Sequence, residues 1–286
     1  MSRTVYVNGS YVPENEAKIS VFDRGFLFAD GVYEVTAVLS GKLVDFAGHM
    51  KRLRRSLSEL ALASPANDDE LLAIHRELVS RNGIEEGLIY MQISRGVADR
   101  DFAFPPEGTE PSLVLFTQQK TLRETTVSKT GITVATVPDL RWRRCDIKTV
   151  QLLYPSLAKM EAKAKGADDA WMVDENGFVT EGTSNNAYIV KQDGTVITRH
   201  LSNDILHGIT RASVVGLAEQ EGCTVEVRPF SVDEAKAAQE AFITSASAFV
   251  MPVVSIDGQT IGAGTPGDFT RRLRERYIAH AEETAI

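Results

Sequence analysis

A short polar segment near the middle of the chain, residues 144–149, separates a strand pattern from a helix pattern. Residues 132–137 form a β-like run, and Pro155 suits the first position of the helix that follows. Lys148 is therefore predicted to lie between a strand and a helix, where catalytic side chains are often displayed. A single lysine is most often only a solvated surface residue, so its interpretation depends on the rest of the sequence.

Helix patterns recur in both halves of the chain. Residues 48–62 and 69–81 are predicted to form amphipathic helices in the first half. In the second half, Leu157, Met160 and Ala164 are spaced to share one apolar face of a helix. Strand patterns lie between these helices, and the alternation predicts an α+β fold.

The predicted domains are unequal in size. Residues 120–130 are polar and have no clear period, so we expect them to link the two domains. The smaller N-terminal domain is expected over residues 1–119, and the larger C-terminal domain over residues 131–286. A chain of 286 residues is long enough for one large or two medium domains.

Composition excludes several classes of function. The net charge of −8 argues against nucleic acid as a partner, because phosphate binding needs a basic surface. No apolar run approaches the roughly 20 residues that span a bilayer, and the first residues lack the apolar core of a signal peptide. Cys145 and Cys223 make no disulfide framework, which favours a reducing cytoplasm. No motif indicates a metal site.

A second motif, Thr-Glu-Gly-Thr-Ser-Asn, occupies residues 180–185. Its glutamate, Glu181, follows Lys148 by 33 residues; taken alone, a glutamate before a glycine is most often a turn residue. Further on, residues 208–210 begin a predicted helix, whose free backbone N–H groups are suited to binding a phosphate. The small residues 244–247 offer a second backbone surface for such a group, although both segments also fit an ordinary helix cap and an ordinary loop.

In their order and spacing, these segments resemble the class IV (fold type IV) pyridoxal-phosphate aminotransferases, and within them the D-amino acid transaminase branch. The resemblance runs from residues 6–9 to residues 252–253. It implies a two-domain α+β architecture, with a smaller N-terminal α/β domain and a larger, β-rich C-terminal pseudo-barrel.

The resemblance also implies pyridoxal 5′-phosphate as the cofactor. Lysine amines form Schiff bases with carbonyls, so Lys148 would hold the cofactor as an internal aldimine and later move the Cα proton. Glu181 would be the acidic partner of the pyridinium nitrogen. The other implied cofactor-binding residues in the second half are Thr183, Ser184, Asn185, Leu206, Gly208, Ile209, Thr210, Ser245 and Ala246.

An arginine of the first-half helix is implied as a phosphate ligand. An arginine suits this role because its planar fork binds phosphate oxygens bidentately. Helical spacing does not distinguish Arg52, Arg54 and Arg55, since all three flank the apolar stripe. The family pattern, at 19 residues after Tyr33, selects Arg52.

Tyr33, Arg100 and Phe102 are the candidate substrate-binding residues. An amino acid brings a carboxylate, which needs a cation and a hydroxyl. The resemblance assigns these to Arg100 and Tyr33. The family's histidine, two residues after Arg100, is replaced here by Phe102, which leaves an apolar surface in place of one donor.

The resulting prediction is transamination between a D-amino acid, such as D-alanine or D-glutamate, and a 2-oxo acid. Phe102 favours an (R)-selective amine:pyruvate transaminase as the rival. A branched-chain L-amino acid transaminase is disfavoured, because residues 146–149 follow the D-amino acid branch, and an aminodeoxychorismate lyase fits least. A small-molecule binding protein without turnover is the alternative of another class. The resemblance implies a homodimer whose partners are small amino donors and 2-oxo acids.

Overall fold

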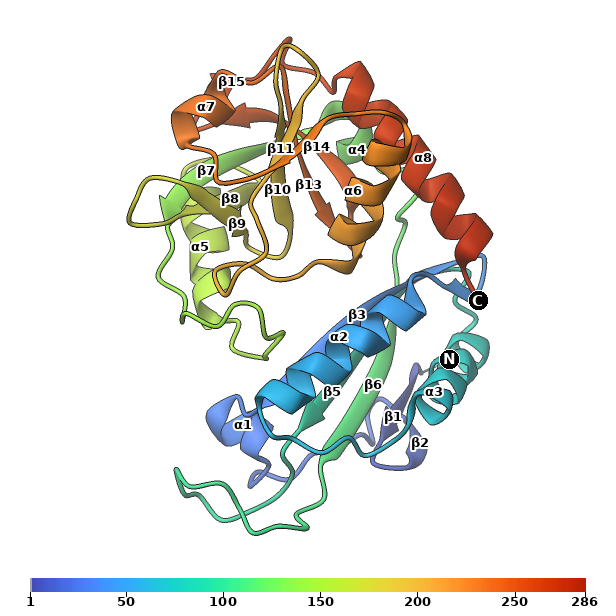
Figure 1. Cartoon of the computed structure of the whole chain (residues 1–286). Helices are drawn as coiled ribbons and strands as arrows, with labels where there is room; N and C mark the ends of the chain where they lie inside the picture. Colours follow the sequence, from blue (N-terminus) through green and yellow to red (C-terminus); the bar gives the residue numbers. More distant parts are fainter. Residues whose placement is uncertain (1) are drawn as a thin grey trace. The chain divides into compact units, whose positions relative to one another are not determined.

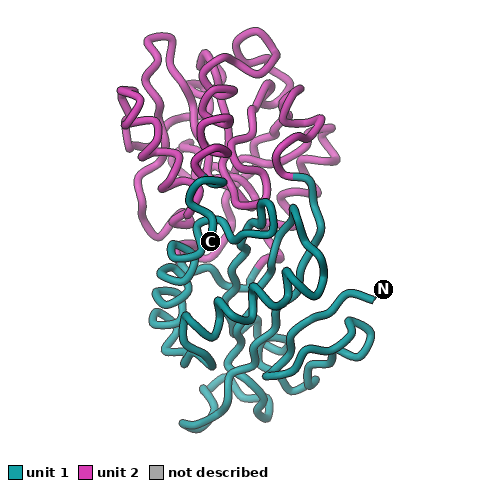
Figure 2. Tube along the Cα trace, turned by 90° about the vertical axis from the view of Figure 1, so that its right-hand side faces the viewer, with its two compact units in different colours: residues 1–121, 147–151, 281–286 teal, residues 122–146, 152–280 magenta. Residues whose placement is uncertain are grey.

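The computed structural model describes residues 2–286, which form two compact units (Figures 1 and 2). Unit 1 consists of Met1–Thr121, Ile147–Gln151 and Ala281–Ile286, and unit 2 of Leu122–Asp146 and Leu152–His280. Within the described residues no helix is long and apolar enough to cross a membrane, and no group of three or more His, Cys, Asp or Glu residues is placed to hold a metal ion.

Unit 1 is built on a six-stranded sheet in the order β2-β1-β6-β5-β3-β4, in which every neighbouring pair is antiparallel. The hairpin predicted at residues 8–9 is confirmed: Asn8 and Gly9 have φ of 44° and 91°, as a two-residue hairpin turn requires. The strands are β1 (Thr4–Val7), β2 (Ser10–Pro13), β3 (Gly31–Leu39), β4 (Lys42–Leu43), β5 (Glu86–Ser94) and β6 (Ser112–Gln119).

The helices of unit 1 are α1 (Arg24–Phe28), α2 (Phe46–Glu59) and α3 (Asp68–Asn82), so both helices predicted in the first half are confirmed (Figure 1). Helix α2 places its apolar stripe, Met50, Leu53 and Leu57, in the hydrophobic core of the unit. Helix α3 begins at a capping box and ends at Gly83, whose φ of 58° closes the last turn.

Unit 2 carries a nine-stranded sheet in the order β12-β11-β10-β13-β14-β7-β8-β9, with β15 paired to β14. Only residues 183–185 connect β9 to β10, although four strands lie between them in the sheet order. The sheet must therefore curl so that its β9 edge approaches β10. The strands are β7 (Ile132–Pro138), β8 (Asp169–Val173), β9 (Val179–Gly182), β10 (Asn186–Val190), β11 (Val196–Thr198), β12 (Val225–Val227), β13 (Glu240–Ser245), β14 (Phe249–Ile256) and β15 (Gln259–Thr260).

Five helices accompany this sheet: α4 (Thr126–Thr130), α5 (Leu153–Ala164), α6 (Ile209–Gln220), α7 (Val232–Lys236) and α8 (Asp268–Thr284). Helix α4 lies inside residues 120–130, the segment expected to link the two domains. Its start is fixed by Thr125 and Ser128, whose side chains each bond the other's backbone N–H. A helix of five residues is too short to produce a helical period that can be recognised in the sequence.

Helix α5 begins at Leu153, two residues before the predicted Pro155, and it does not pack through its large apolar residues. The buried face is formed by Ala158 and Ala162, which lie against the core of β7 and β8. Leu157 and Met160 of the predicted apolar face are 57% and 62% exposed in the chain. The spacing correctly indicated a helix, but small residues, which allow close packing on a sheet, form its contact face.

Candidate active site

Lys148 is fixed by its backbone to one end of β3 in unit 1. Its carbonyl oxygen accepts a hydrogen bond from the Tyr33 N–H at 3.0 Å, and the next residue, Thr149, forms an antiparallel bridge with Val32. On the other side, Ile147 is buried in the hydrophobic core of the unit. These contacts hold the backbone of Lys148 against β3, so its side chain extends from a fixed point and not from a flexible loop.

The Lys148 side chain is half-buried, and its amine lies 4.2 Å from the centre of the Tyr33 ring. That ring is stacked on Tyr90, with a centroid separation of 5.4 Å. Among residues 2–286 no carboxylate forms an ion pair with the Lys148 amine. An amine that is not held by a carboxylate can act as the nucleophile in Schiff-base chemistry.

Arg52 belongs to a buried charge cluster at the sheet-facing side of α2. Its Nε and Nη2 donate to the two oxygens of Glu34 on β3, at 2.8 and 2.6 Å, in a bidentate pair. His49, one turn earlier on α2, contacts the same carboxylate through Nδ1 at 2.7 Å. Burial alone would raise the pKa of Glu34, but Arg52 and His49 lower it to about 2. The Arg52 guanidinium is therefore oriented by a permanently charged partner.

This geometry separates the three arginines that helical spacing left equivalent. Arg52 is buried, whereas Arg54 forms an ion pair with Asp68 and Arg55 lies 3.9 Å from Glu59, both at the surface. Sequence reasoning missed Glu34 as the partner. The available signal was a glutamate at an inward position of an otherwise apolar strand pattern.

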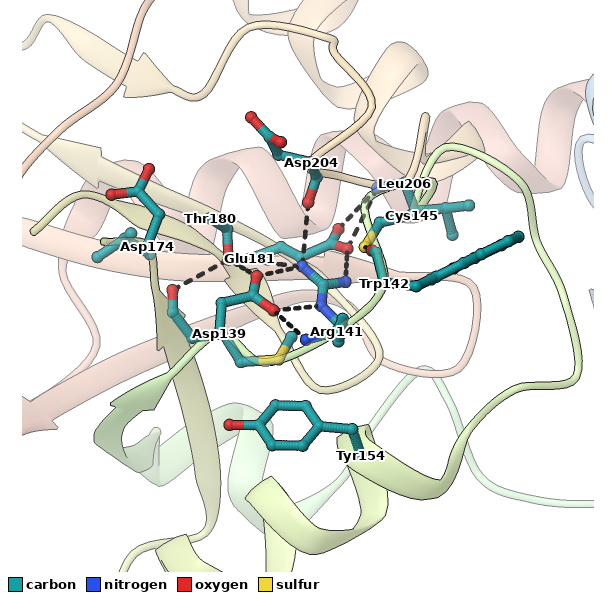
Figure 3. A network of polar contacts seen from close by, with 12 residues as sticks. Asp139, Arg141, Trp142, Cys145, Tyr154, Asp174, Thr180, Glu181, Asp204 and Leu206 are labelled. Carbon is teal, nitrogen blue, oxygen red and sulfur yellow. Dashed lines mark hydrogen bonds and ion pairs between the residues drawn. The ribbon is translucent and has the colours of Figure 1, made fainter. Parts of the chain in front are cut away.

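Glu181, on β9 of unit 2, is buried in a network of polar contacts (Figure 3). Its carboxylate accepts hydrogen bonds from Arg141 Nη1 at 2.5 Å and from Asn186 Nδ2 at 2.9 Å. The backbone N–H of Leu206 donates to both oxygens, at 3.2 and 3.1 Å. Burial raises the pKa of Glu181, and Arg141 opposes that rise.

Arg141 is the residue that the sequence did not reveal. Figure 3 shows its guanidinium between Glu181 and Asp139, and it donates to Asp139 through Nε at 2.9 Å and Nη2 at 2.7 Å. Burial disfavours the charged guanidinium, but Glu181 and Asp139 outweigh it and raise the pKa of Arg141. Arg141 therefore stays charged, and its charge favours the ionised form of Glu181.

The turn after Glu181 is held by a carboxylate that was also not predicted. Asp169, on β8, accepts hydrogen bonds from the Thr183 hydroxyl at 2.6 Å and the Asn185 amide at 2.8 Å. Lys159 of α5 lies 3.1 Å from the same carboxylate. The side chains of Thr183 and Asn185 thus brace the turn, while Ser184 at its tip is exposed. Cofactor contacts of these three residues remain a prediction.

The start of α6 adjoins the same network. Asn186 donates one hydrogen bond to Glu181 and another to the Leu206 carbonyl oxygen, at 3.0 Å. A Cβ at Gly208 would lie 2.1 Å from the Asn186 amide oxygen, so only glycine fits at this N-cap. No side chain caps the helix start, which leaves N–H groups of its first turn for an anion. Thr210 is buried in that turn.

Ser245 and Ala246 lie at the end of β13, beside the same strand as Asn186. Residue Thr244, just before them, pairs with Asn186 across β10 and β13. The Ser245 hydroxyl lies 3.4 Å from that of Ser247. Unit 2 therefore brings together most of the residues predicted for the cofactor from the second half of the chain.

Of the three predicted substrate residues, Arg100 and Phe102 contact each other, whereas Tyr33 is not joined to Arg100 in unit 1. Arg100 and Phe102 lie in the loop between β5 and β6, where Arg100 is exposed and Phe102 is 81% exposed. Tyr33 lies on β3. Within the described part of the chain, no hydrogen bond or ring contact links Tyr33 to Arg100.

The chain matches the family model for class IV amino-transferases over residues 31–256. A D-alanine aminotransferase of Staphylococcus aureus (strain N315) is 40% identical over 283 residues, covering 99% of each chain. The chain belongs to the class IV aminotransferases. A D-alanine aminotransferase of Bacillus licheniformis is 38% identical over 272 residues, covering 94% of each chain.

Solved structures agree with this family. A branched-chain amino acid aminotransferase of T.th. with pyridoxamine 5′-phosphate has a TM-score of 0.90 and 29% identity, covering 98% of this chain and 94% of its own. The same enzyme with N-(5′-phosphopyridoxyl)-L-glutamate has a TM-score of 0.88 and 30% identity, covering 99% and 95%. The predicted α+β, fold type IV architecture is confirmed. As a class IV aminotransferase, this protein is a pyridoxal-phosphate-dependent transaminase.

The residues present in each unit fit this cofactor. Unit 1 offers the Lys148 amine, which has no acidic partner among the described residues, and unit 2 offers Glu181, a carboxylate buried beside the charged Arg141. The uncapped start of α6 suits a phosphate.

Replacing Arg52 by lysine tests its assignment to the cofactor phosphate. The lysine keeps a cation beside Glu34, whereas alanine would leave that buried carboxylate with His49 as its remaining partner. Loss of the planar fork should weaken cofactor affinity about tenfold, the effect of one charge-assisted hydrogen bond, with donor preference unchanged. Affinity is measured by absorbance titration of the apoenzyme. Arg55→Lys on the same helix is the control, and equal affinity in both variants would contradict the assignment.

Proposed function

We propose that this aminotransferase transfers the amino group of a D-amino acid, such as D-alanine or D-glutamate, to a 2-oxo acid. The observation that carries the proposal is similarity to D-alanine aminotransferases over nearly the whole chain, at 40% and 38% identity. The retained Lys148 and the buried Glu181 support turnover rather than simple binding of a small molecule.

Lys148 carries two tasks in this proposal. Its amine would hold the cofactor covalently, and as a free amine it would take the Cα proton of the substrate. When bound, pyridoxal phosphate supplies an electron sink for the electrons of the broken Cα–H bond. The backbone pairing of Lys148 with Tyr33 keeps the Lys148 main chain at a constant position through both tasks.

Glu181 would hold the proton on the pyridine nitrogen of the cofactor. Arg141 supports this role, because its charge opposes the rise in the pKa of Glu181 that burial causes. A neutral amide would not retain the ring proton, so proton abstraction in Glu181→Gln at close to the wild-type rate would contradict this role.

The phosphate is assigned to three groups of donors. Arg52 supplies a fixed guanidinium, and the first turn of α6 supplies backbone N–H groups together with the Thr210 hydroxyl. Ser245 and Ala246 supply a small-residue turn that lets the phosphate approach the backbone. All three recognise a part of the cofactor that is the same for every amino donor.

Arg100 is proposed to bind the donor carboxylate, with Tyr33 as a hydroxyl donor. A second candidate function is that of an (R)-selective amine:pyruvate transaminase. The exposed ring of Phe102 favours it, because an apolar surface can accept an amino donor that bears no carboxylate. The two functions differ in whether Arg100 is needed.

Arg100→Ala should separate these functions. Hydrogen bonds to a charged group contribute about 1.5–3 kcal/mol, so kcat/KM for D-alanine should fall about ten- to a hundredfold. The value for (R)-1-phenylethylamine should not change, because this donor has no carboxylate. Phe102→His should shift preference further toward D-alanine by adding a donor.

The same measurements contain their own control and their refutation. L-Leucine is the control donor, since faster turnover of L-leucine than of D-alanine by the unmodified enzyme would replace the proposal with the branched-chain activity. An equal loss for both D-alanine and the amine in Arg100→Ala, or no loss, would show that Arg100 does not bind the carboxylate.

We also propose that the enzyme is a cytoplasmic homodimer. Both cysteines are free, which fits a reducing compartment. Exposed apolar side chains are concentrated on two surfaces, and patches of this kind mark interaction sites. They are Leu153, Leu157 and Met160 on α5 of unit 2, and Phe22, Phe26, Phe102 and Phe104 on α1 and the β5–β6 loop of unit 1.

The oligomeric state can be tested through α5. The unmodified enzyme should have a mass in solution of twice 31.3 kDa by light scattering. Replacing both Leu157 and Met160 by aspartate should shift it to the monomer, because the new charges cannot be buried. Lys163→Asp changes the net charge by the same amount at an exposed position of α5 and should leave the dimer intact. A monomeric unmodified enzyme would contradict the proposal.

A further inference from the structure

Three arginines and three phenylalanines of unit 1, from α1 and from the β5–β6 loop that carries Arg100, alternate in space. Arg95 lies 3.7 Å from the ring centre of Phe104, and Arg24 lies 5.9 Å from that ring and 4.5 Å from Phe28. Arg100 lies 5.3 Å from the Phe28 ring. It also lies 5.5 Å from the ring of Phe102. The guanidinium of Arg100 thus contacts both aromatic rings, those of Phe28 and Phe102.

The inner end of this arrangement is rigid. Arg24 and Arg95 are buried, and each donates through Nε to the same oxygen of Asp30 at 2.8 Å. Arg24 also donates to the Asp101 carbonyl oxygen at 2.7 Å, within the loop itself. Arg95 is held further by the Leu60 and Ala61 carbonyl oxygens, at 2.8 and 3.0 Å. The loop is therefore tied to a fixed base immediately beside Arg100.

The outer end of this arrangement, at Arg100, has no contact with an acidic side chain. Among residues 2–286, Arg100 has no hydrogen bond or ion pair, and its contacts are the Phe28 and Phe102 rings. A ring face attracts a guanidinium without occupying its N–H groups. All five donors of Arg100 therefore stay available to a planar anion such as a carboxylate. Phe28 contacts Phe102 edge-on at 5.7 Å, so the two rings brace each other.

We propose that Phe28 is a positioning residue for the amino donor. Together with Phe102 it orients the Arg100 guanidinium for the carboxylate of an α-amino acid, an inference that rests on the proposed role of Arg100. Phe102 then replaces a hydrogen-bond donor of the family with a ring that holds Arg100 in place. The donor class selected is an amino acid with a free carboxylate next to the amine.

The test compares Phe28→Leu and Phe28→Tyr in the holoenzyme, each alone and combined with Arg100→Ala. Leucine keeps an apolar side chain without a ring face, and tyrosine keeps the ring. An exposed cation–π contact corresponds to about a two- to fivefold effect. KM for D-alanine should rise by this factor in Phe28→Leu with kcat unchanged, and Phe28→Tyr should restore it. The inhibition constant of propionate, which has the carboxylate but no amine, should rise in parallel.

The combined variants decide the mechanism. If Phe28 acts through Arg100, Phe28→Leu should cause no further change in the Arg100→Ala background, and KM for (R)-1-phenylethylamine should not respond in either background. An equal effect with and without Arg100 would overturn the inference while leaving the carboxylate role of Arg100 intact. No turnover of D-alanine by the unmodified enzyme would instead refute the proposed function, and this inference with it.

Folding is monitored separately. Cofactor content and melting temperature of each variant should match those of the unmodified enzyme. If Phe28→Leu does not fold, Phe102→Leu, at a side chain that is 81% exposed, provides the same comparison from the other ring. An unchanged KM for D-alanine in Phe102→Leu would then overturn the inference.

Discussion

The backbone pairing between Lys148 and Tyr33 is the interaction on which the proposed chemistry depends. The chain leaves unit 2 after Asp146, and Ile147–Gln151 belong to unit 1 before the chain continues in unit 2. Within those residues the Tyr33 N–H bonds the Lys148 carbonyl oxygen, and Thr149 bridges Val32. A segment of this length has no hydrophobic core of its own, so Lys148 is held in place by its pairing with the ordered strand β3. Reaction at one amine requires this constancy of position.

Each unit pairs a buried glutamate with an arginine for a different purpose. Glu34 is paired so strongly that its pKa falls to about 2, and it serves to orient Arg52. At Glu181 burial prevails, and its pKa is raised in spite of Arg141. A carboxylate of higher basicity is the better acceptor for a ring proton, while one of low basicity is the better fixed counter-ion. In the proposed function, the two pairs therefore use similar residues, one to orient Arg52 and the other to retain the ring proton.

The sequence predicted those structural elements that depend on interactions between residues close together in the chain. The periodicity that placed α2, α3 and α6, and the turn at Asn8 and Gly9, depend on neighbours along the chain. Glu181 and Lys148 were predicted as site residues only from the order and spacing of the motifs that contain them. Arg141 and Asp169 were missed, because Glu181 lies 40 residues from Arg141, and Thr183 and Asn185 lie 14 and 16 residues from Asp169. The contact face of α5 was obscured because alanines, and not its larger apolar residues, pack on the sheet.

The central claim, that Lys148 carries the cofactor, is tested most directly by borohydride reduction of the holoenzyme. Reduction converts the Schiff base to a stable secondary amine, which survives proteolysis and is located by mass spectrometry of the peptides. The structure predicts a phosphopyridoxyl group on the peptide containing Lys148 and none in Lys148→Ala. Lys159, which is paired with Asp169, should remain unmodified. A label on Lys159 or on any lysine other than Lys148 would contradict the account.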